Sequence, residues 1–214
     1  PLTVVVPTFS TKSVRQGTPV SGQSNEITVT LAANYDLIAH ATTKVTISGL
    51  TGSGTADDTA LNVTTCHLNS LGRTGVWQRV SGKLVLTVGS TVHANTACEV
   101  KFSLINPMSD QLSPPGVSVQ ATMADGSGGT FSITITNMTK PGTALFGVAS
   151  GEDPLTVSVP MFTVKSIGQS ATISGQNNTI SATLEANYNL ADGSTVTITG
   201  LTGSQTTDTP SLSI

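Results

Sequence analysis

Cysteine is the residue type in this chain whose positions point most directly to covalent chemistry. Cys66 and Cys98 are the only two cysteines. A bond between them would close a loop of roughly 33 residues, and the chain-entropy model gives such a loop about 3 to 4 kcal/mol of stabilisation. In an oxidising compartment we therefore expect a Cys66–Cys98 disulfide, with two unpaired buried thiols as the alternative.

Three Asn-x-Ser/Thr tripeptides form a second group of candidate modification sites. They begin at Asn62, Asn137 and Asn177. Asn62 alternates with inward-pointing neighbours, so its own side chain should face solvent, and Asn177 lies in the turn-like stretch SGQNNT. Asn137 has the inward phase of its strand, but the following residues, NMTKPG, are typical of a strand end. We expect N-linked glycans at all three positions in a secreted protein, with ordinary surface asparagines as the alternative.

Catalytic and metal-binding patterns are absent from the sequence. His40, His67 and His93 share no metal-ligand spacing. The Asp57-Asp58 pair and the turn ADGSGG at residues 124–129 lack the alternating acidic positions of a calcium loop. Neither a G-x-S-x-G elbow nor a phosphate-binding glycine loop occurs. The sequence therefore predicts no enzyme, no cofactor and no metal site.

Trp77 is the single tryptophan, within GVWQRVSG. Its ring could stack on a sugar, which makes it a possible glycan contact, or it could cover the edge of the core. Aromatic residues make up only 4% of the chain, so a platform of several rings is not evident. The same scarcity disfavours single-stranded nucleic acid as a partner.

Composition narrows the class of protein further. Charged residues are 10% of the chain, net charge is −3, and Ser and Thr together are 61 of 214 residues. This balance, with no basic run, argues against nucleic acid and anionic membranes as partners. No apolar stretch approaches the ~20 residues of a membrane-spanning helix, so no membrane insertion is expected. Together with the cysteines and the tripeptides, the hydroxyl-rich composition favours an extracellular location, secreted or at the cell surface.

The elements that must position these residues are predicted to be strands. Apolar residues alternate with polar ones in EITVTLAANY from Glu26, KLVLTV from Lys83 and CEVKFSLIN from Cys98, a period of two that is typical of half-buried strands. No segment has a helical stripe. About eight strands in the first 139 residues predict an all-β fold of immunoglobulin-like antiparallel β-sandwich repeats.

The chain repeats itself. Residues 1–36 are identical to residues 154–189 at 20 positions, and VTISGLTGS at residues 45–53 returns as VTITGLTGS at 196–204. We therefore expect a complete β-sandwich unit at 1–139, an inter-repeat joint at 140–153, and the start of a second, incomplete unit at 154–214. The missing half is expected from continuation of the chain, or else from a neighbouring chain. Apolar residues of the joint, Leu145, Phe146 and Val148, are expected to pack against an adjacent unit and stiffen it.

Four stretches of the sequence carry a resemblance to a known family: VTISGLTGS, FSLINP, VSVQATM, and KPGTALFGVASGED followed by a PLTV segment. They resemble tandem β-sandwich repeats in surface proteins of algae and other aquatic protists. The resemblance implies a secreted, glycosylated fibre or cell-coat protein and supplies no catalytic or binding residues. The leading hypothesis is a structural repeat of an extracellular filament or coat. Its partners would be neighbouring repeats of the same protein, in a filamentous homo-assembly, together with covalent glycans. The alternative is an adhesin stalk or a carbohydrate-binding β-sandwich module.

Overall fold

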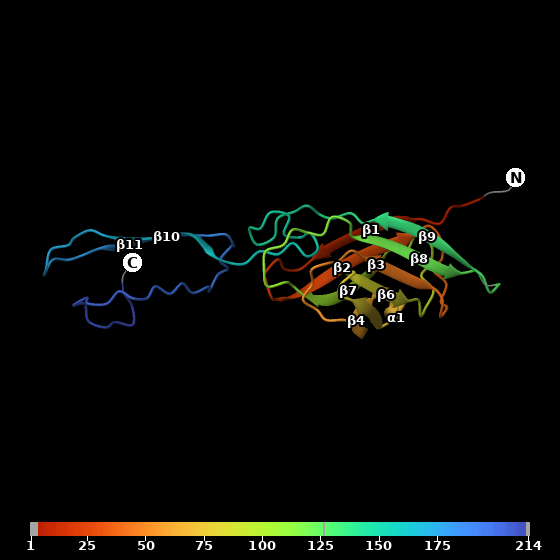
Figure 1. The fold of residues 1–214 in the computed structure, drawn as a ribbon, viewed down its shortest axis with the longest axis horizontal. Helices are drawn as coiled ribbons and strands as arrows, with labels where there is room; N and C mark the ends of the chain where they lie inside the picture. The colour runs from red at the N-terminus through yellow and green to blue at the C-terminus, as the bar shows by residue number, and fades with distance from the viewer. Residues whose placement is uncertain (1–3, 126, 213–214) are drawn as a thin grey trace.

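The protein is built from antiparallel strand pairs and one short helical turn. The computed structural model describes residues 4–125 and 127–212. Its elements, shown in Figure 1, are β1 (Phe9–Gln16), β2 (Ser24–Ala33), β3 (Lys44–Ser48), β4 (Asp58–Thr65), α1 (Cys66–Asn69), β5 (Thr74–Gln78), β6 (Lys83–Thr87), β7 (Cys98–Ile105), β8 (Ser118–Ala124), β9 (Thr130–Asn137), β10 (Phe162–Gln169) and β11 (Ile180–Ala186). The all-β class expected from the alternation is confirmed.

The first nine strands form one sheet that nearly closes on itself, in the order β1-β2-β7-β4-β5-β6-β3-β8-β9. β4 turns one corner: its last residues, Val63–Thr65, pair with β7, whereas Asp58–Asn62 pair with β5 across a register shift. At the other corner the end of β9 meets β1, where the Val14 amide donates to the Thr139 carbonyl at 3.0 Å. The two halves of the sheet thus face each other across a single core.

The core follows the predicted alternation. Every second residue of β2, β6 and β7 is buried, and β3, β5 and β8 add the facing side chains. The largest fully buried side chains of the first unit are those of Trp77, Ile27, Leu31, Ile47, Leu50, Leu71, Leu84, Leu86, Leu104, Met123 and Ile133. Because the inward residues come from both halves of the sheet, burial of this apolar surface supplies the main driving force for folding.

A β-bulge in β9 changes the phase of that strand. Val119 pairs with Thr136, yet Ala121 pairs with Ile133 rather than with Thr134, so the register shifts between them. Ile133 is buried, but the residues that follow turn outward until Met138 is buried again. Such an extra residue reverses which face later side chains occupy. As a result Asn137 is exposed although the strand extends to it.

In the second repeat the described residues contain one hairpin. β10 pairs with β11 in the register of β1 with β2, including the same shift after the first residue, Phe9 or Phe162. Ile167 and Leu184 are substantially exposed here, whereas their counterparts in the first repeat, Val14 and Leu31, lie in the core. The hairpin has therefore folded without the strands that cover its apolar face in the first unit.

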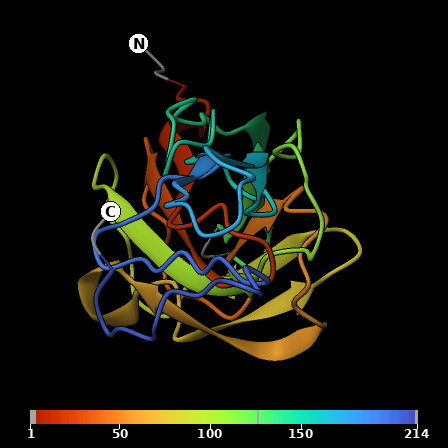
Figure 2. The ribbon, with the colours of Figure 1, turned by 90° about the vertical axis from the view of Figure 1, so that its left-hand side faces the viewer.

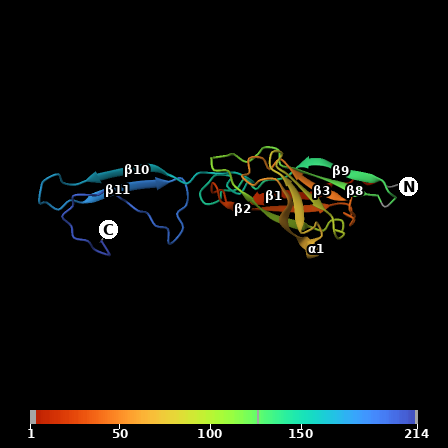
Figure 3. The same ribbon diagram turned by 60° about the horizontal axis from the view of Figure 1, so that its bottom comes forward.

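The two repeats lie end to end along the long axis of the molecule. Figure 1 shows the hairpin of β10 and β11 extending from one end of the first unit, while the chain leading into β1 leaves from the other end. Figure 2 looks along this axis with the second repeat in front, and Figure 3 shows the hairpin running on in the same direction. The joint between repeats is thus the feature that sets the overall shape.

Candidate interaction site at the joint between repeats

The first residues of the second repeat are built into the end of the first unit. Val157 exchanges two backbone hydrogen bonds with Gln111, at 2.8 and 2.9 Å, and Ser158 exchanges two with the Pro19–Ser21 loop, at 2.8 and 3.2 Å. The segment therefore runs as a short strand between two loops of the first unit. We call residues 154–159 the plug, and the end of the unit that receives them the socket.

The side-chain amide of Gln16 is the main polar group of the socket. It is 3% exposed, and its Nε2 donates to the carbonyls of Gly151 and Thr156 at 2.8 and 2.7 Å. Its Oε1 accepts from the Leu155 amide at 2.7 Å. One glutamine thus satisfies three backbone groups of the incoming chain, groups that would cost about 1 to 3 kcal/mol each if buried without a partner.

Two buried asparagines hold Gln16 in place. Asn25 Nδ2 donates to Gln16 Oε1 at 2.7 Å and to Asn106 Oδ1 at 2.8 Å. Asn106 Nδ2 then donates to the carbonyls of Thr18 and Val20, at 3.0 and 2.8 Å. Since both polar ends of each amide are used, the network orients the socket without an unsatisfied buried group.

Apolar contacts complete the plug. The side chain of Leu155 is 0% exposed and that of Val157 is 3% exposed. Leu155 adopts a φ of +56°, a left-handed conformation that is unfavourable for a leucine. Burial of its side chain, which is worth about 2 kcal/mol, offsets that strain. The apolar pocket of the socket thus holds Leu155 in a backbone conformation that a free chain would disfavour.

The joint also contacts the second repeat through Phe146. The Leu145–Val148 segment forms a tight turn closed by hydrogen bonds of 3.1 and 3.0 Å. Phe146, at a φ of +52°, stacks on Tyr188 with ring centroids 5.8 Å apart. Burial beside the first unit raises the pKa of Tyr188. Of the three residues expected to stiffen the joint, Phe146 makes the inter-repeat contact, while Leu145 and Val148 mainly close the turn.

The socket is already half present in the second repeat. Asn178 Nδ2 donates to Gln169 Oε1 at 2.9 Å, and Asn178 Oδ1 accepts from the amides of Ser170 and Ala171 at 3.1 and 3.0 Å. These contacts match those of Asn25 and Gln16, but here both side chains are exposed. These hydrogen bonds between the glutamine, the asparagine and the nearby backbone therefore do not depend on a plug.

The disulfide lies away from this site and has the expected pairing. Cys66 and Cys98 are joined, with their Cα atoms 5.1 Å apart. Cys66 follows β4 directly and Cys98 begins β7, and these strands are paired, Thr65 opposite Val100. The bond thus secures the corner at which β4 passes from one half of the sheet to the other.

The three expected glycan acceptors are all exposed. Asn62 faces out from β4 between Leu61 and the buried Val63, as the alternation predicts. Asn137 faces out because of the bulge in β9, and Asn177 lies in the loop between β10 and β11. Each asparagine is therefore accessible to a glycosyltransferase. Glycosylation at all three positions stays a prediction.

A polar groove opens beside Asn62, where β4 separates from β7. It has a volume of about 730 Å³ and gathers charged side chains of both signs, Glu26, Asp58, Arg73 and Lys101. In a chain with so few charges, this is an unusual concentration. Because Asn62 itself lines the groove, a glycan attached there would lie over it.

Trp77 proves to be a core residue. Its side chain is 1% exposed, and its indole nitrogen donates to the Thr55 carbonyl at 3.2 Å. With neither ring face accessible, Trp77 cannot stack on a sugar. Of the two interpretations of this residue, packing within the core is the one that the structure supports, and the expected glycan contact is corrected accordingly.

The acidic residues considered as metal ligands instead accept hydrogen bonds from nearby backbone amides. Asp57 accepts from the Arg79 amide at 2.7 Å and Asp58 from the Ala60 amide at 2.8 Å. Asp125 accepts from Ser127 and Gly129, and the Ser127 amide is the main group that lowers the Asp125 pKa. Among the described residues, no three His, Cys, Asp or Glu side chains gather in a metal-binding cluster.

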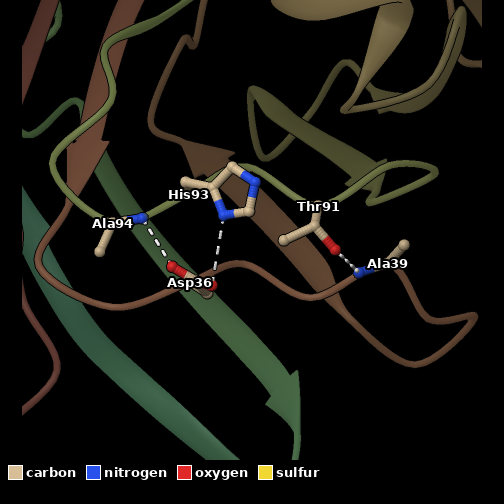
Figure 4. A network of polar contacts seen from close by, with 5 residues as sticks. All are labelled: Asp36, Ala39, Thr91, His93 and Ala94. Atoms are coloured by element: carbon tan, nitrogen blue, oxygen red, sulfur yellow. Dashed lines mark hydrogen bonds and ion pairs between the residues drawn. The ribbon is translucent and has the colours of Figure 1, made fainter.

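The histidines are exposed, and His93 belongs to a small polar network between two loops. Asp36 accepts from the Ala94 amide at 2.7 Å and lies 3.4 Å from His93 Nδ1, while Thr91 accepts from the Ala39 amide at 3.2 Å (Figure 4). The Ala94 hydrogen bond is the main cause of a lowered Asp36 pKa. These contacts tie the loop after β2 to the loop before β7, at the end of the unit opposite the joint.

Residues of the socket were not identified by motif searching. The available signal was periodicity: Gln16 has the inward phase of Val14, and Asn25 has the inward phase of Ile27. Both polar residues also recur in the second repeat, as Gln169 and Asn178. A polar residue at an inward position that is kept in both copies indicates a buried hydrogen-bond network.

No protein-family model matches the chain, and no curated protein matches it.

No helix of the described residues is long and apolar enough to cross a membrane.

Proposed function

We propose that this chain is a structural repeat of an extracellular, glycosylated filament or cell-coat protein, built from tandem immunoglobulin-like β-sandwich units. The observation that carries the proposal is that the end of the joint and the first residues of the second repeat, residues 151–158, are hydrogen-bonded into the end of the first unit. A flexible linker would allow neighbouring units to tumble. A buried plug instead holds them in one relative orientation, as a fibre requires.

The nearly closed sheet supports the immunoglobulin-like part of the proposal. Its two halves face each other across one core, and β4 contributes to both. Strands that change sheets at a corner are found in sandwiches of this general architecture. The unit is also elongated along the same axis as the pair of repeats (Figure 1), which suits end-to-end stacking.

The extracellular and glycosylated parts rest on covalent chemistry. A disulfide joins Cys66 and Cys98, and such bonds persist in oxidising compartments. The acceptor asparagines at 62, 137 and 177 all face solvent. With little surface charge on the chain, attached sugars would supply the hydration that keeps a long array from aggregating.

Imaging of the native material by electron microscopy tests the proposal. We expect filaments or coats with an axial repeat of a few tens of ångströms, the length of strands of this size, and density projecting from Asn62 and Asn177. Treatment with a peptide N-glycosidase should remove that density while leaving the axial repeat unchanged. Discrete globular particles with no axial repeat would count against a structural array.

The second candidate is a carbohydrate-binding module or adhesin stalk, and the groove beside Asn62 is the observation that favours it. Glu26, Asp58, Arg73 and Lys101 offer donors and acceptors that a sugar could use. A glycan array would compare the protein, produced without glycans, with its Arg73→Ala/Lys101→Ala variant. Binding that this variant loses would favour the module, whereas no binding to any glycan would leave the structural array as the better proposal.

A further inference from the structure

The groove beside Asn62 lies where the pairing of β4 with β7 ends. The last paired residues are Val63 and Phe102. On the far side of this pair β4 departs to pair with β5, whereas β7 continues to the Ser53–Thr55 loop, which bonds to both the amide and the carbonyl of Ile105. The groove of about 730 Å³ is the opening that this divergence leaves between the two strands.

Two backbone groups open on this groove because the ladder stops. Along a strand, the amide and carbonyl of one residue point to one side and those of the next residue point to the other. The Val63 amide donates to the Arg73 carbonyl beside β5, so the carbonyl of Asn62 points toward β7. The amide of Ile105 bonds to the 53–55 loop on the side of β7 away from β2, and the amide of Ser103, two residues earlier, points the same way. The next hydrogen bond of the ladder would join the Ser103 amide to the Asn62 carbonyl, and the pairing ends before it.

The charged side chains of the groove balance each other. Glu26 and Asp58 are acidic, and Arg73 and Lys101 are basic. Their formal charges sum to zero, which disfavours an ion or a strongly charged ligand. Hydrogen bonds to charged groups are stronger than those between neutral groups, so the same side chains suit a neutral ligand that is rich in hydroxyl and amide groups. A sugar is a ligand of this kind.

An N-linked glycan on Asn62 would begin inside this groove. The side chain of Asn62 is exposed and forms part of the groove wall. The first sugar of such a glycan is an N-acetylglucosamine, whose acetamido group has one N–H donor and one carbonyl acceptor. The open end of the ladder offers the converse pair, the Asn62 carbonyl and the Ser103 amide. Covalent attachment also removes most of the entropic cost of binding, because the sugar is already at the site.

The other two acceptor asparagines have different surroundings. Asn137 is exposed at the end of β9, and Asn177 is exposed in the loop between β10 and β11. Neither residue belongs to the groove. Glycans at these two positions should therefore extend into solvent, which makes Asn177 a natural control for Asn62.

We propose that the first sugars of an N-linked glycan on Asn62 dock in the groove between β4 and β7 of the same unit, where the Ser103 amide and the charged side chains of the groove hold them. The outer sugars extend from the groove. The inference rests on the proposed function, since it specifies how one of the expected glycans lies on the unit. A docked glycan covers the gap at which β4 passes from one half of the sheet to the other, and so stabilises the corner that the disulfide also secures.

The test compares two single-glycan forms of the full chain, secreted from a eukaryotic host that is fed ¹³C-labelled glucosamine. Asn137→Gln/Asn177→Gln keeps only the Asn62 acceptor, and Asn62→Gln/Asn137→Gln keeps only Asn177 as the matched control. Intact mass measures the glycan on each form. We expect NMR order parameters of the first sugar of about 0.85 on Asn62, as in a rigid backbone, and below about 0.6 on Asn177, as in a flexible segment. Equal mobility of the two sugars, or an Asn62 that stays unmodified where Asn177 is modified, overturns the proposal.

A second measurement separates docking from a structural role of the groove itself. Arg73→Ala/Lys101→Ala is made in the form that keeps the Asn62 glycan and in the form that carries Asn62→Gln. With the glycan, the unfolding equilibrium constant, from urea unfolding followed by Trp77 fluorescence, should rise about tenfold, the factor for losing one or two hydrogen bonds. Without the glycan it should change less than about twofold, as is usual for surface substitutions. An equal change with and without the glycan contradicts docking.

The outcomes for docking and for the array are distinct. The NMR measurement changes no groove side chain other than Asn62 in the control, so it stands even where Arg73→Ala/Lys101→Ala does not fold. Native filaments whose Asn62 glycan is as mobile as the one on Asn177 would refute docking alone, and a docked glycan without native filaments would refute the array alone. A mobile Asn62 glycan together with sugar binding in trans would overturn docking and assign the groove to the carbohydrate-binding module.

Discussion

Replacing Gln16 by alanine would remove the hydrogen-bond partner of four buried groups at once. The carbonyls of Gly151 and Thr156 lose their donor, and the Leu155 amide and one N–H of Asn25 lose their acceptor. Each such group costs about 1 kcal/mol or more when left unpaired. Water that enters the vacated space can serve some of them, so we expect a total loss of about 3 to 5 kcal/mol.

The second repeat contains the matched control. Gln169 occupies the same place in its hairpin but is exposed, and its side chain accepts a hydrogen bond from Asn178. Surface substitutions of this kind usually change stability by less than about 0.5 kcal/mol. Gln169→Ala should therefore be close to neutral, although the two glutamines occupy equivalent positions of the repeat.

Two measurements report different parts of the loss. Urea unfolding followed by Trp77 fluorescence gives the free energy of unfolding of the first unit, because Trp77 is the single tryptophan. Hydrogen exchange at the Val157 amide, which donates to the Gln111 carbonyl and not to Gln16, reports release of the plug, which should become about a hundredfold faster in Gln16→Ala. Equal effects of Gln16→Ala and Gln169→Ala, or unchanged exchange at Val157, would refute the assigned role of the amide.

Three other outcomes follow from the structure. Cys66→Ser/Cys98→Ser should lower the free energy of unfolding by about 3 to 4 kcal/mol, from a separation of 32 residues, and a loss below about 1 kcal/mol in urea would contradict this. Gly82→Ala places a Cβ against the backbone of Leu50 at a φ of +57° and should cost about 3 kcal/mol, which a thermal melt would detect. The pKa of Asp36 is lowered in the folded state, so the stabilisation that its carboxylate provides is present above pH ~4 and is lost as the pH falls further. The difference in free energy of unfolding between the protein and Asp36→Ala should therefore shrink as the pH falls. A constant difference from pH 7 to pH 3 would exclude this linkage.

Local periodicity was sufficient to predict most of the first unit. The alternation in residues 26–35, 83–88 and 98–106 matches β2, β6 and β7 to within about two residues. The pairing of Cys66 with Cys98 followed from the same strands. The exposure of Asn137 did not follow from its phase, because a bulge depends on the partner strand and leaves no mark in the residues of β9 themselves.

The joint shows where sequence reasoning was insufficient. A break in alternation at residues 140–153 suggested a connector, and apolar Leu145, Phe146 and Val148 drew attention to it. The stronger contacts come from residues 151–158, of which 154–158 repeat the start of the chain and so look like the first strand of a new unit. Which unit a segment joins depends on tertiary contacts with Gln111 and Gln16, distant in sequence, and periodicity within the segment cannot reveal them.

Since the first unit is completed by residues that belong to the following repeat, its folding during synthesis must be staggered. When the ribosome has made residues 1–139, the socket of the first unit has no plug, and Gln16, Asn25 and Asn106 can hydrogen-bond only with water or with one another. Final closure waits until Leu155 and Val157 have emerged, roughly one to a few seconds later at ordinary synthesis rates. Domains of a multidomain chain commonly misfold by pairing with the wrong neighbour. A short delay followed by closure with the next segment to appear would favour pairing with the correct neighbour.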